Sequence, residues 1–357
     1  MLEISLVLCL LALLLTLINS FSVITPKDSQ QINQKISVLV PLRDEEDNAV
    51  AIIQTLAAQE NLSDVEFLIL NDASTDNTYE LVKATASNDA RFKVMQGKSL
   101  PQGWLGKPWA LAQLSESAKG EILICIDADV RLAVNGIAAA ITAMDQSKCD
   151  FFSPYPHQVA RTFTERMIQP LLQWSWLSSV PLAIAKRSTN SAFAVANGQF
   201  FVVKKSALEK SGGYDSIKSE VLDDMQMARV LLRNKFRGTV GNGALIAQCH
   251  MYSSWSELRN GYAKSLWKGF GGPFGSLLAI SLLALTGIVP LVSAASGSPF
   301  GWFAFEAILL SRVISARITR SNLFDSLLHP ISAALLIYLI TYSWLMRGRI
   351  QWKGRTV

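Results

Sequence analysis

Residues 120–130 read GEILICIDADV, a short apolar run that ends on two aspartates. The run itself, residues 122–126, carries no charge and is rich in Ile, as expected of a parallel strand that is covered on both faces. Residues 36–42 and 65–70 have the same character. Helical patterns alternate with these runs and lie at residues 48–58, 75–87 and 107–118. Alternating strands and helices predict an open, doubly wound α/β sheet.

Three later elements extend this region toward the C-terminus. We expect a strand at residues 199–203, a helix at 222–232 and another strand at 244–249. Together with the first elements they predict one water-soluble domain over residues 35–253, since this is the part of the chain that mixes charges, short apolar runs and turn signals.

The composition of the whole chain is too apolar for a soluble domain alone. Of its 357 residues 50% are hydrophobic and 17% charged, against about a quarter charged in ordinary soluble domains. Ordinary Gly and Pro contents exclude disorder, and four widely spaced cysteines exclude a disulfide scaffold. The formal charge of +5 suits anionic lipid or phosphate ligands and is too small and dispersed to indicate nucleic acid.

The apolar excess lies at the two ends of the chain. Residues 4–24 carry no charge and are long enough to cross a bilayer, so residues 1–25 are expected to form an N-terminal transmembrane anchor. A cleaved signal peptide is the alternative, but the run lacks a positive segment before it and a short A-x-A site after it. Residues 26–34 are polar and aperiodic and predict a linker.

Apolar segments return after the domain. Residues 254–272 mix aromatic and basic side chains, as in a helix that lies at a membrane interface. Residues 273–346 are expected to hold C-terminal transmembrane or interfacial helices, with spans at 273–295 and 329–346 and a weaker one at 302–318, which charges interrupt. Residues 347–357 form a basic tail. The positive-inside rule predicts the basic clusters near these helices in the cytoplasm, where we also expect the catalytic domain, although an odd number of C-terminal spans would put the tail on the opposite side from that domain.

Carboxylates stand where the predicted strands end. Asp127 and Asp129 point to one face, where they can hold Mg²⁺ or Mn²⁺ against a diphosphate, and the alternative is a solvated turn. Asp72 ends the second strand, next to side chains that cap a helix, and Glu45 follows the first strand. Because ligands of open α/β sheets bind outside the carboxyl ends of the strands, we expect a shared ligand crevice there.

A further acidic cluster begins the helix at 222–232. Asp223 and Asp224 stabilise a helix N-terminus by charge alone, which is the structural explanation of the pair. Paired aspartates can also supply a general base, because a like-charged neighbour raises one pKa toward neutrality.

These motifs resemble family 2 glycosyltransferases, which transfer sugars from nucleotide diphosphates on a GT-A fold. The resemblance runs in order over residues 36–232, and it rests on VLVPLRDEED, FLILNDASTDNT, GWLGKPWALAQ, GEILICIDADV, ANGQFFVVKKSALEKSGGYD and VLDDMQMA. GWLGKPWAL and the tail IQWKGRTV also resemble a membrane-bound subgroup that includes hopanoid-associated and carotenoid glycosyltransferases. The resemblance implies a GT-A nucleotide-diphospho-sugar transferase domain with a mixed sheet, flanked by N-terminal and C-terminal transmembrane helices.

The resemblance also implies roles for individual residues. The donor would be bound by Pro41, Arg43, Glu45, Asp72, Lys107 and Asp127. Asp129 would bind the metal, Mg²⁺ or Mn²⁺, and Asp224, with Asp223 beside it, would be the general base. The acceptor region would comprise Asn197, Gly198 and Gln199, for which a simple turn is the alternative. The chain departs from the family pattern at Asp223, where a Glu is usual, and at Asn71, where an Asp is frequent.

The expected function is that of a membrane-anchored, inverting glycosyltransferase with a cytoplasmic catalytic domain. The donor would be a nucleotide sugar, for which a UDP-sugar is the expected type, and the acceptor would be a lipid or polyisoprenoid hydroxyl. The chain lacks the Q-x-x-R-W motif of processive relatives, which favours single transfer over polymer synthesis. Two alternatives are a polyprenyl-phosphate glycosyltransferase, whose acceptor needs no general base, and a non-catalytic membrane scaffold that binds nucleotide sugars.

Overall fold

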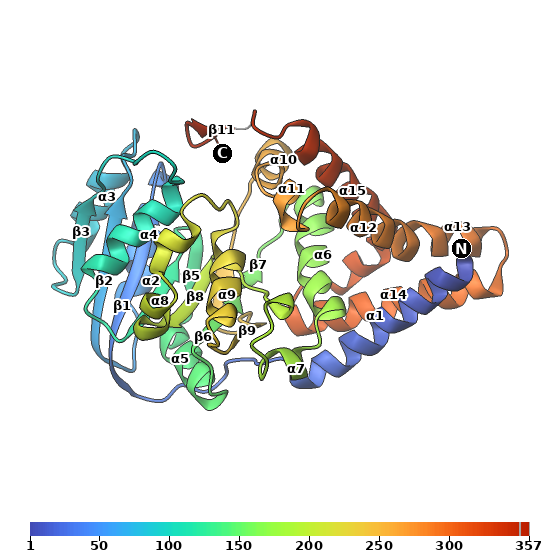
Figure 1. Cartoon of the computed structure of the whole chain (residues 1–357), viewed down its shortest axis with the longest axis horizontal. Helices are drawn as coiled ribbons and strands as arrows, with labels where there is room; N and C mark the ends of the chain where they lie inside the picture. The colour runs from blue at the N-terminus through green and yellow to red at the C-terminus, as the bar shows by residue number, and fades with distance from the viewer. Residues whose placement is uncertain (350, 357) are drawn as a thin grey trace. The chain divides into compact units, whose positions relative to one another are not determined.

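The computed structural model describes residues 1–349 and 351–356, which divide into two compact units. Unit 2 comprises residues 24–157 and 184–249 and holds the predicted sheet. Unit 1 comprises residues 1–23, 158–183 and 250–357 and is helical. Figure 1 labels the elements of both.

A seven-stranded mixed sheet, in the order β3-β2-β1-β4-β8-β6-β9, forms the centre of unit 2. Its strands are β1 (Ile32–Leu42), β2 (Leu62–Asn71), β3 (Phe92–Gln96), β4 (Ile122–Ile126), β6 (Phe151–Tyr155), β8 (Phe200–Lys204) and β9 (Gly238–Asn242). The pairs β1–β2, β1–β4 and β2–β3 are parallel, whereas β8 is antiparallel to both β4 and β6. The carboxyl ends of β1, β2 and β4 therefore meet at one edge, as the sequence predicts.

The helices of unit 2 bury their apolar faces around this sheet. They are α2 (Glu46–Ala57), α3 (Thr78–Ala86), α4 (Gly106–Ser117), α5 (Gly136–Gln146), α8 (Lys205–Lys210) and α9 (Asp223–Arg233). One core cluster joins α4 and α9 to β4 and β8, with Leu111, Leu123, Val203 and Leu231 almost inaccessible to solvent. This packing fixes the first turns of α4 and α9, where Lys107 and Asp224 lie.

Several predicted elements need correction. The linker expected at residues 26–34 ends in strand, because β1 begins at Ile32. The strand expected at 244–249 is confined to β10 (Ala247–Cys249), which pairs with β5 (Val130–Leu132) and follows a turn. The sequence did not predict β9. Glycines at 238 and 241 hide β9, because glycine is rare in strands. The interfacial segment forms two helices, α10 (Trp255–Ala263) and α11 (Leu266–Gly269).

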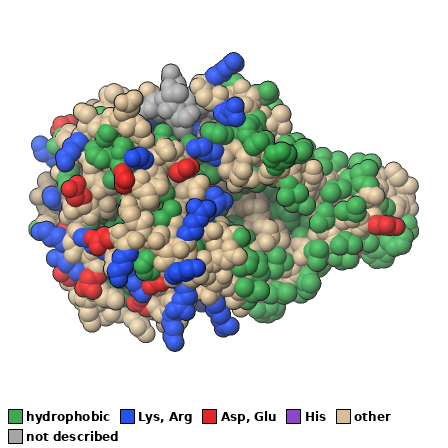
Figure 2. Space-filling view, in the orientation of Figure 1, with side chains coloured by type: hydrophobic (Ala, Val, Ile, Leu, Met, Phe, Trp, Pro, Cys, Tyr) green, Lys and Arg blue, Asp and Glu red, His purple; other side chains and the backbone are tan. Residues whose placement is uncertain are grey.

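Among its described residues, unit 1 contains four helical segments that are long and apolar enough to cross a membrane, Leu2–Ser22, Pro273–Ala295, Pro299–Thr319 and Leu323–Leu345. The second is α12 (Pro273–Leu283), a π-helical turn at Ala284–Ile288 and α13 (Val289–Ala295). The segment with interrupting charges is α14 (Pro299–Thr319), and the last includes α15 (His329–Leu345). Helix α1 (Leu2–Ser22) lies along α14 (Figure 1). Hydrophobic side chains cover the long helices of unit 1 in Figure 2.

One helix from the middle of the sequence belongs to unit 1. Helix α6 (Phe163–Ser179) falls inside the predicted 35–253 domain, yet it packs with α1, α14 and α15. Its buried residues Ile168, Leu171 and Trp174 belong to the same apolar cluster as residues of α1, α14 and α15, which explains why α6 belongs to unit 1. In the basic tail, the side chains of Trp352 and Arg355 lie outside the described residues.

Candidate active site

Lys107 forms the centre of an ionic cluster in unit 2. Its ammonium group lies 2.7 Å from Asp127 Oδ1 and 3.9 Å from Asp223 Oδ2, and it donates to the Gly198 carbonyl at 3.4 Å. Burial alone would lower the pKa of Lys107, but the three neighbouring aspartates raise it above its ordinary value. Lys107 therefore stays charged and links the end of β4 to the start of α9.

Asp224 is held from two sides in the first turn of α9. Its Oδ2 accepts a hydrogen bond from the Gly198 amide at 2.6 Å, and its Oδ1 accepts one from the Met225 amide at 2.7 Å. Burial, and then the charge of Asp223, raises the pKa of Asp224 to about 7, against the opposing effect of Lys107. Because a general base works best with a pKa near the operating pH, this environment suits proton abstraction.

Gly198 makes this close arrangement possible. A Cβ atom at this position would lie 3.1 Å from Lys107 Nζ and 3.3 Å from Asp224 Oδ2, tighter than ordinary side-chain contacts. The turn around it is also fixed, since the Asn197 amide donates to Ser153 Oγ at 2.8 Å and Gln199 N donates to Asn197 Oδ1 at 2.9 Å. The turn interpretation of this segment is therefore correct, and the same turn contacts Asp224.

Asp129 lies beyond β4, in a buried position. Its Oδ1 has no hydrogen-bond partner, and the Cys249 thiol of β10 lies close enough to interact with the carboxylate. Burial, followed by the charges of Asp127 and Glu45, raises the pKa of Asp129 to about 7. An unsatisfied buried carboxylate oxygen is costly unless a cation or a proton occupies it.

The donor set fits a divalent cation that the substrate helps to bind. Within residues 1–349 and 351–356, no group of three His, Cys, Asp or Glu side chains is placed to hold a metal. Mg²⁺ and Mn²⁺ are hard cations, and Mg²⁺ is commonly bound by one or two carboxylates together with substrate phosphates. The unpartnered Asp129 oxygen, with Asp127 two residues away, agrees with that mode.

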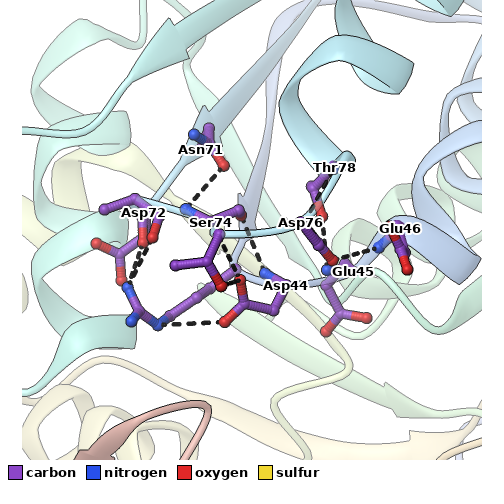
Figure 3. A network of polar contacts seen from close by, with 11 residues as sticks. Asp44, Glu45, Glu46, Asn71, Asp72, Ser74, Asp76 and Thr78 are labelled. Carbon is purple, nitrogen blue, oxygen red and sulfur yellow. Dashed lines mark hydrogen bonds and ion pairs between the residues drawn. The ribbon is translucent and has the colours of Figure 1, made fainter.

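Hydrogen bonds between two loops shape the other side of the site, at the ends of β1 and β2 (Figure 3). Arg43 Nη1 donates to the Asp72 and Ala73 carbonyls at 2.7 and 3.2 Å. The Asp44 amide donates to Ser74 Oγ, and Asp44 Oδ1 accepts from the Thr75 amide at 2.7 Å. Arg43 thus ties the loops together, and these contacts hold Asp72, 5% exposed, at the end of β2.

The same hydrogen-bond network continues to the starts of α2 and α3. The Glu45 amide donates to Thr78 Oγ1 at 2.7 Å, and the Glu46 amide donates to Asp76 Oδ2 at 3.1 Å. Asp76 in turn accepts from the Thr78 amide, the first of α3, although the N-cap residue of that helix is Asn77. Pro41 lies in β1 beside Leu70 of β2.

The structure groups the predicted residues into two sets on one edge of the sheet. One set comprises Pro41, Arg43, Glu45 and Asp72, and the other comprises Lys107, Asp127, Asn197, Gly198, Gln199, Asp223 and Asp224. Asp129 interacts electrostatically with one member of each set, Glu45 and Asp127. A backbone contact ties β4 to the turn at residues 197–199, because the Asp127 amide donates to the Gln199 carbonyl at 3.1 Å.

Three residues that contact the site, Asn48, Arg131 and Cys249, were not predicted from the sequence. Arg131 Nη2 donates to Asn48 Oδ1 at 2.6 Å, and Asn48 Nδ2 donates to Glu45 Oε2 at 3.0 Å, which joins the first loop to β5. Cys249 reaches Asp129 from more than a hundred residues away in the sequence. No local motif marks these positions, since each acts through a contact made only in the folded chain.

Residues 37–212 match the family described as glycosyl transferase family 2. This domain belongs to that family. The chain is 21% identical to a 4,4'-diaponeurosporenoate glycosyltransferase of Staphylococcus aureus over 90% of this chain and 88% of the relative. It is 25% identical to a beta-monoglucosyldiacylglycerol synthase of Nostoc sp. over 65% of this chain and 50% of the relative.

A mannosyltransferase from Pyrobaculum calidifontis, solved with GDP-Man and Mn²⁺, has a similar structure. The comparison covers 99% of this chain and 100% of that one, with a TM-score of 0.56 and 18% identity. At this identity the likeness establishes the fold, which is GT-A. The family match over residues 37–212 confirms the expected glycosyltransferase family, and this likeness confirms the expected fold class.

Proposed function

We propose that this glycosyltransferase inverts the anomeric centre while it transfers a sugar from a nucleotide diphosphate to a lipid hydroxyl. The observation that carries the proposal is Asp224, a carboxylate with a pKa of about 7 that is fixed by two backbone amides beside Lys107. Each Asp224 oxygen uses one lone pair on an amide and keeps another for a proton.

The proposed step is a single displacement in which Asp224 accepts a proton and cations balance the charge of the leaving diphosphate. The acceptor oxygen attacks the anomeric carbon opposite the leaving group, its proton passes to Asp224, and the bond to the diphosphate oxygen breaks. Asp129 and Asp127 would hold the divalent metal, which would supply positive charge to neutralise the charge that develops on the diphosphate. Lys107, already bound to Asp127, adds a fixed cation near the same strand end. Arg43, Pro41, Glu45 and Asp72 are proposed for the nucleoside.

Similarity to named lipid glycosyltransferases supports the acceptor class. The relatives' names describe a diaponeurosporenoate and a diacylglycerol product, both long apolar molecules. Four segments that can cross a membrane suit an acceptor held in a bilayer. We propose UDP-sugars as the first donors to test and GDP-Man as the second, with the catalytic unit in the cytoplasm because basic clusters flank the C-terminal helices.

Transfer by detergent-purified protein tests the proposal. Labelled nucleotide sugars, Mg²⁺ or Mn²⁺ and a total lipid extract are combined with wild type, Asp129→Asn, Asp224→Asn and the exposed control Asp64→Asn. We expect a labelled lipid with wild type and the control, a loss of at least a hundredfold in both site variants, and an inverted anomeric configuration by NMR.

The remaining outcomes separate the alternatives. Full activity in Asp224→Asn would contradict the general base and favour an acceptor that is already anionic, such as a polyprenyl phosphate. Nucleotide-sugar binding without turnover under every condition would favour the scaffold. A retained anomeric configuration would contradict single displacement.

A further inference from the structure

Arg312 is a buried arginine in the middle of α14, inside unit 1. Its side chain is 2% exposed, and its Nε and Nη1 atoms have no hydrogen-bond partner. It lies seven residues before Thr319, the end of the helix, or about 10 Å along the helix axis. A charged side chain so far inside an apolar helical segment is costly, and such residues commonly mark binding sites.

The neighbours of Arg312 on the same helix face are also polar and buried. Ser311, Ser315 and Thr319 are at most 2% exposed and recur at helical spacing along α14. The Ser315 hydroxyl, one turn from Arg312, likewise has no partner. The unsatisfied guanidinium atoms can only donate, and a hydroxyl can donate as well, so together they suit an anion.

The protein supplies little negative charge to balance Arg312. The acidic side chain that interacts electrostatically with it is Asp325, in the turn before α15. Arg166 of α6 already binds that carboxylate, with Nε 3.1 Å from Oδ1 and 3.2 Å from Oδ2 and Nη2 2.5 Å from Oδ1. Two guanidinium groups thus share one carboxylate, which leaves this part of unit 1 with positive charge in excess.

Two aromatic side chains also lie beside Arg312 or its ring partner. The Arg312 guanidinium lies over the Trp174 ring at 5.8 Å, and the Trp174 indole donates to Ser311 Oγ at 2.8 Å. His329, at the start of α15, meets the edge of the same ring at 5.2 Å. Trp174 therefore positions the guanidinium, but a ring face does not satisfy its N–H donors.

We propose that Arg312 and Ser315 bind the anionic head of an amphiphile, a carboxylate or a phosphate carried on an apolar chain. Exposed apolar side chains on the same helices, Leu310 of α14 and Ile331 of α15, offer the chain of such a molecule an apolar surface. Arg166, with 38% of its side chain exposed, covers Asp325 at the more accessible side of the cluster. The site is independent of sugar transfer and lies outside the residues proposed for it.

Binding of matched probes to the full-length protein in a neutral detergent, without donor, tests the site. Oleate and oleyl phosphate carry the anion on one chain, oleyl alcohol carries none, and inorganic phosphate lacks the chain. Native mass spectrometry counts bound probe, and the thermal unfolding midpoint gives its effect. We expect oleate or oleyl phosphate to bind at least tenfold more tightly than oleyl alcohol, and phosphate alone to give no shift at equal concentration.

Arg312→Met and Arg317→Met form a matched pair of variants on one helix, since Arg317 is exposed. Without probe, Arg312→Met is expected to unfold at a higher temperature than wild type, because it removes a buried charge without hydrogen-bond partners. It should lose the preference for anionic probes, and Arg317→Met should keep it.

Three results would overturn the proposal. They are equal binding of oleyl alcohol and the anionic probes by wild type, an equal shift with free phosphate, or an undiminished anion preference in Arg312→Met. The wild-type comparison needs no variant, so it is decisive even if Arg312→Met does not fold.

Discussion

Replacing Lys107 with Gln should move the acidic limb of the activity profile to higher pH. Lys107 Nζ and Asp224 Oδ2 both lie within 3.3 Å of one point beside Gly198, so they are at most about 6.4 Å apart. Opposite charges at about 6 Å interact by about 3 kcal/mol at an effective dielectric of about 20, or about two pH units. Because 32% of the Lys107 side chain is exposed, we expect a shift of about one to two units.

The direction follows from the charges. A cation stabilises the ionised carboxylate, so its removal raises the pKa of Asp224 from about 7 to about 8 or 9. At pH 7 the ionised fraction would fall from about a half to between about 9% and 1%, which predicts a loss of about five- to fiftyfold in kcat/KM. Most of that loss should be recovered above pH 9.

The assay is transfer of labelled sugar at subsaturating acceptor, from pH 5.5 to 9.5. Lys107→Arg retains the charge and should keep the limb near pH 7, and Lys204→Gln, which removes a lysine bonded to Asp150, controls for loss of a cation elsewhere in unit 2. An unchanged limb in Lys107→Gln, or a loss of activity that is equal at all pH values, would refute this account of Asp224.

Two further predictions concern unit 2. Asp223→Asn removes the negative charge that raises the pKa of Asp224. In the same assay the acidic limb should therefore move to lower pH by about one unit, opposite to the shift in Lys107→Gln. A shift to higher pH would contradict the like-charge effect. Gly238→Ala places a Cβ atom against the Phe151 carbonyl and ring of the neighbouring strand, and it should destabilise the protein by about 1–3 kcal/mol. A lower thermal unfolding midpoint measures that effect, and an unchanged midpoint would show that β9 and β6 can separate without cost.

Local patterns in the sequence are sufficient for the central strands and for the residues at their ends. The apolar runs predict β1, β2 and β4, and the aspartates that follow them lie at the carboxyl edge of the sheet, as expected from parallel strand geometry. The first turns of α4 and α9, which carry Lys107 and Asp224, also follow from helical spacing. The roles of these residues in transfer remain predictions.

Other features depend on contacts between distant segments. The domain predicted over residues 35–253 included the stretch that forms α6, but the apolar face of this helix is buried among α1, α14 and α15. Cys249 and Arg131 contact Asp129 and Asn48, and no spacing in the sequence connects the members of these pairs. The sequence shows that α14 carries charged residues, but it does not show which of them is buried.

The sequence by itself therefore determined the class of fold, the candidate carboxylates and the segments able to cross a membrane, because these depend on local periodicity and composition. Only the tertiary structure decided the environment of each charge. It placed Lys107 among three aspartates and left Arg312 without hydrogen-bond partners at Nε and Nη1. The physical reason is that burial and electrostatic interaction depend on distances in space, which packing sets between residues far apart along the chain.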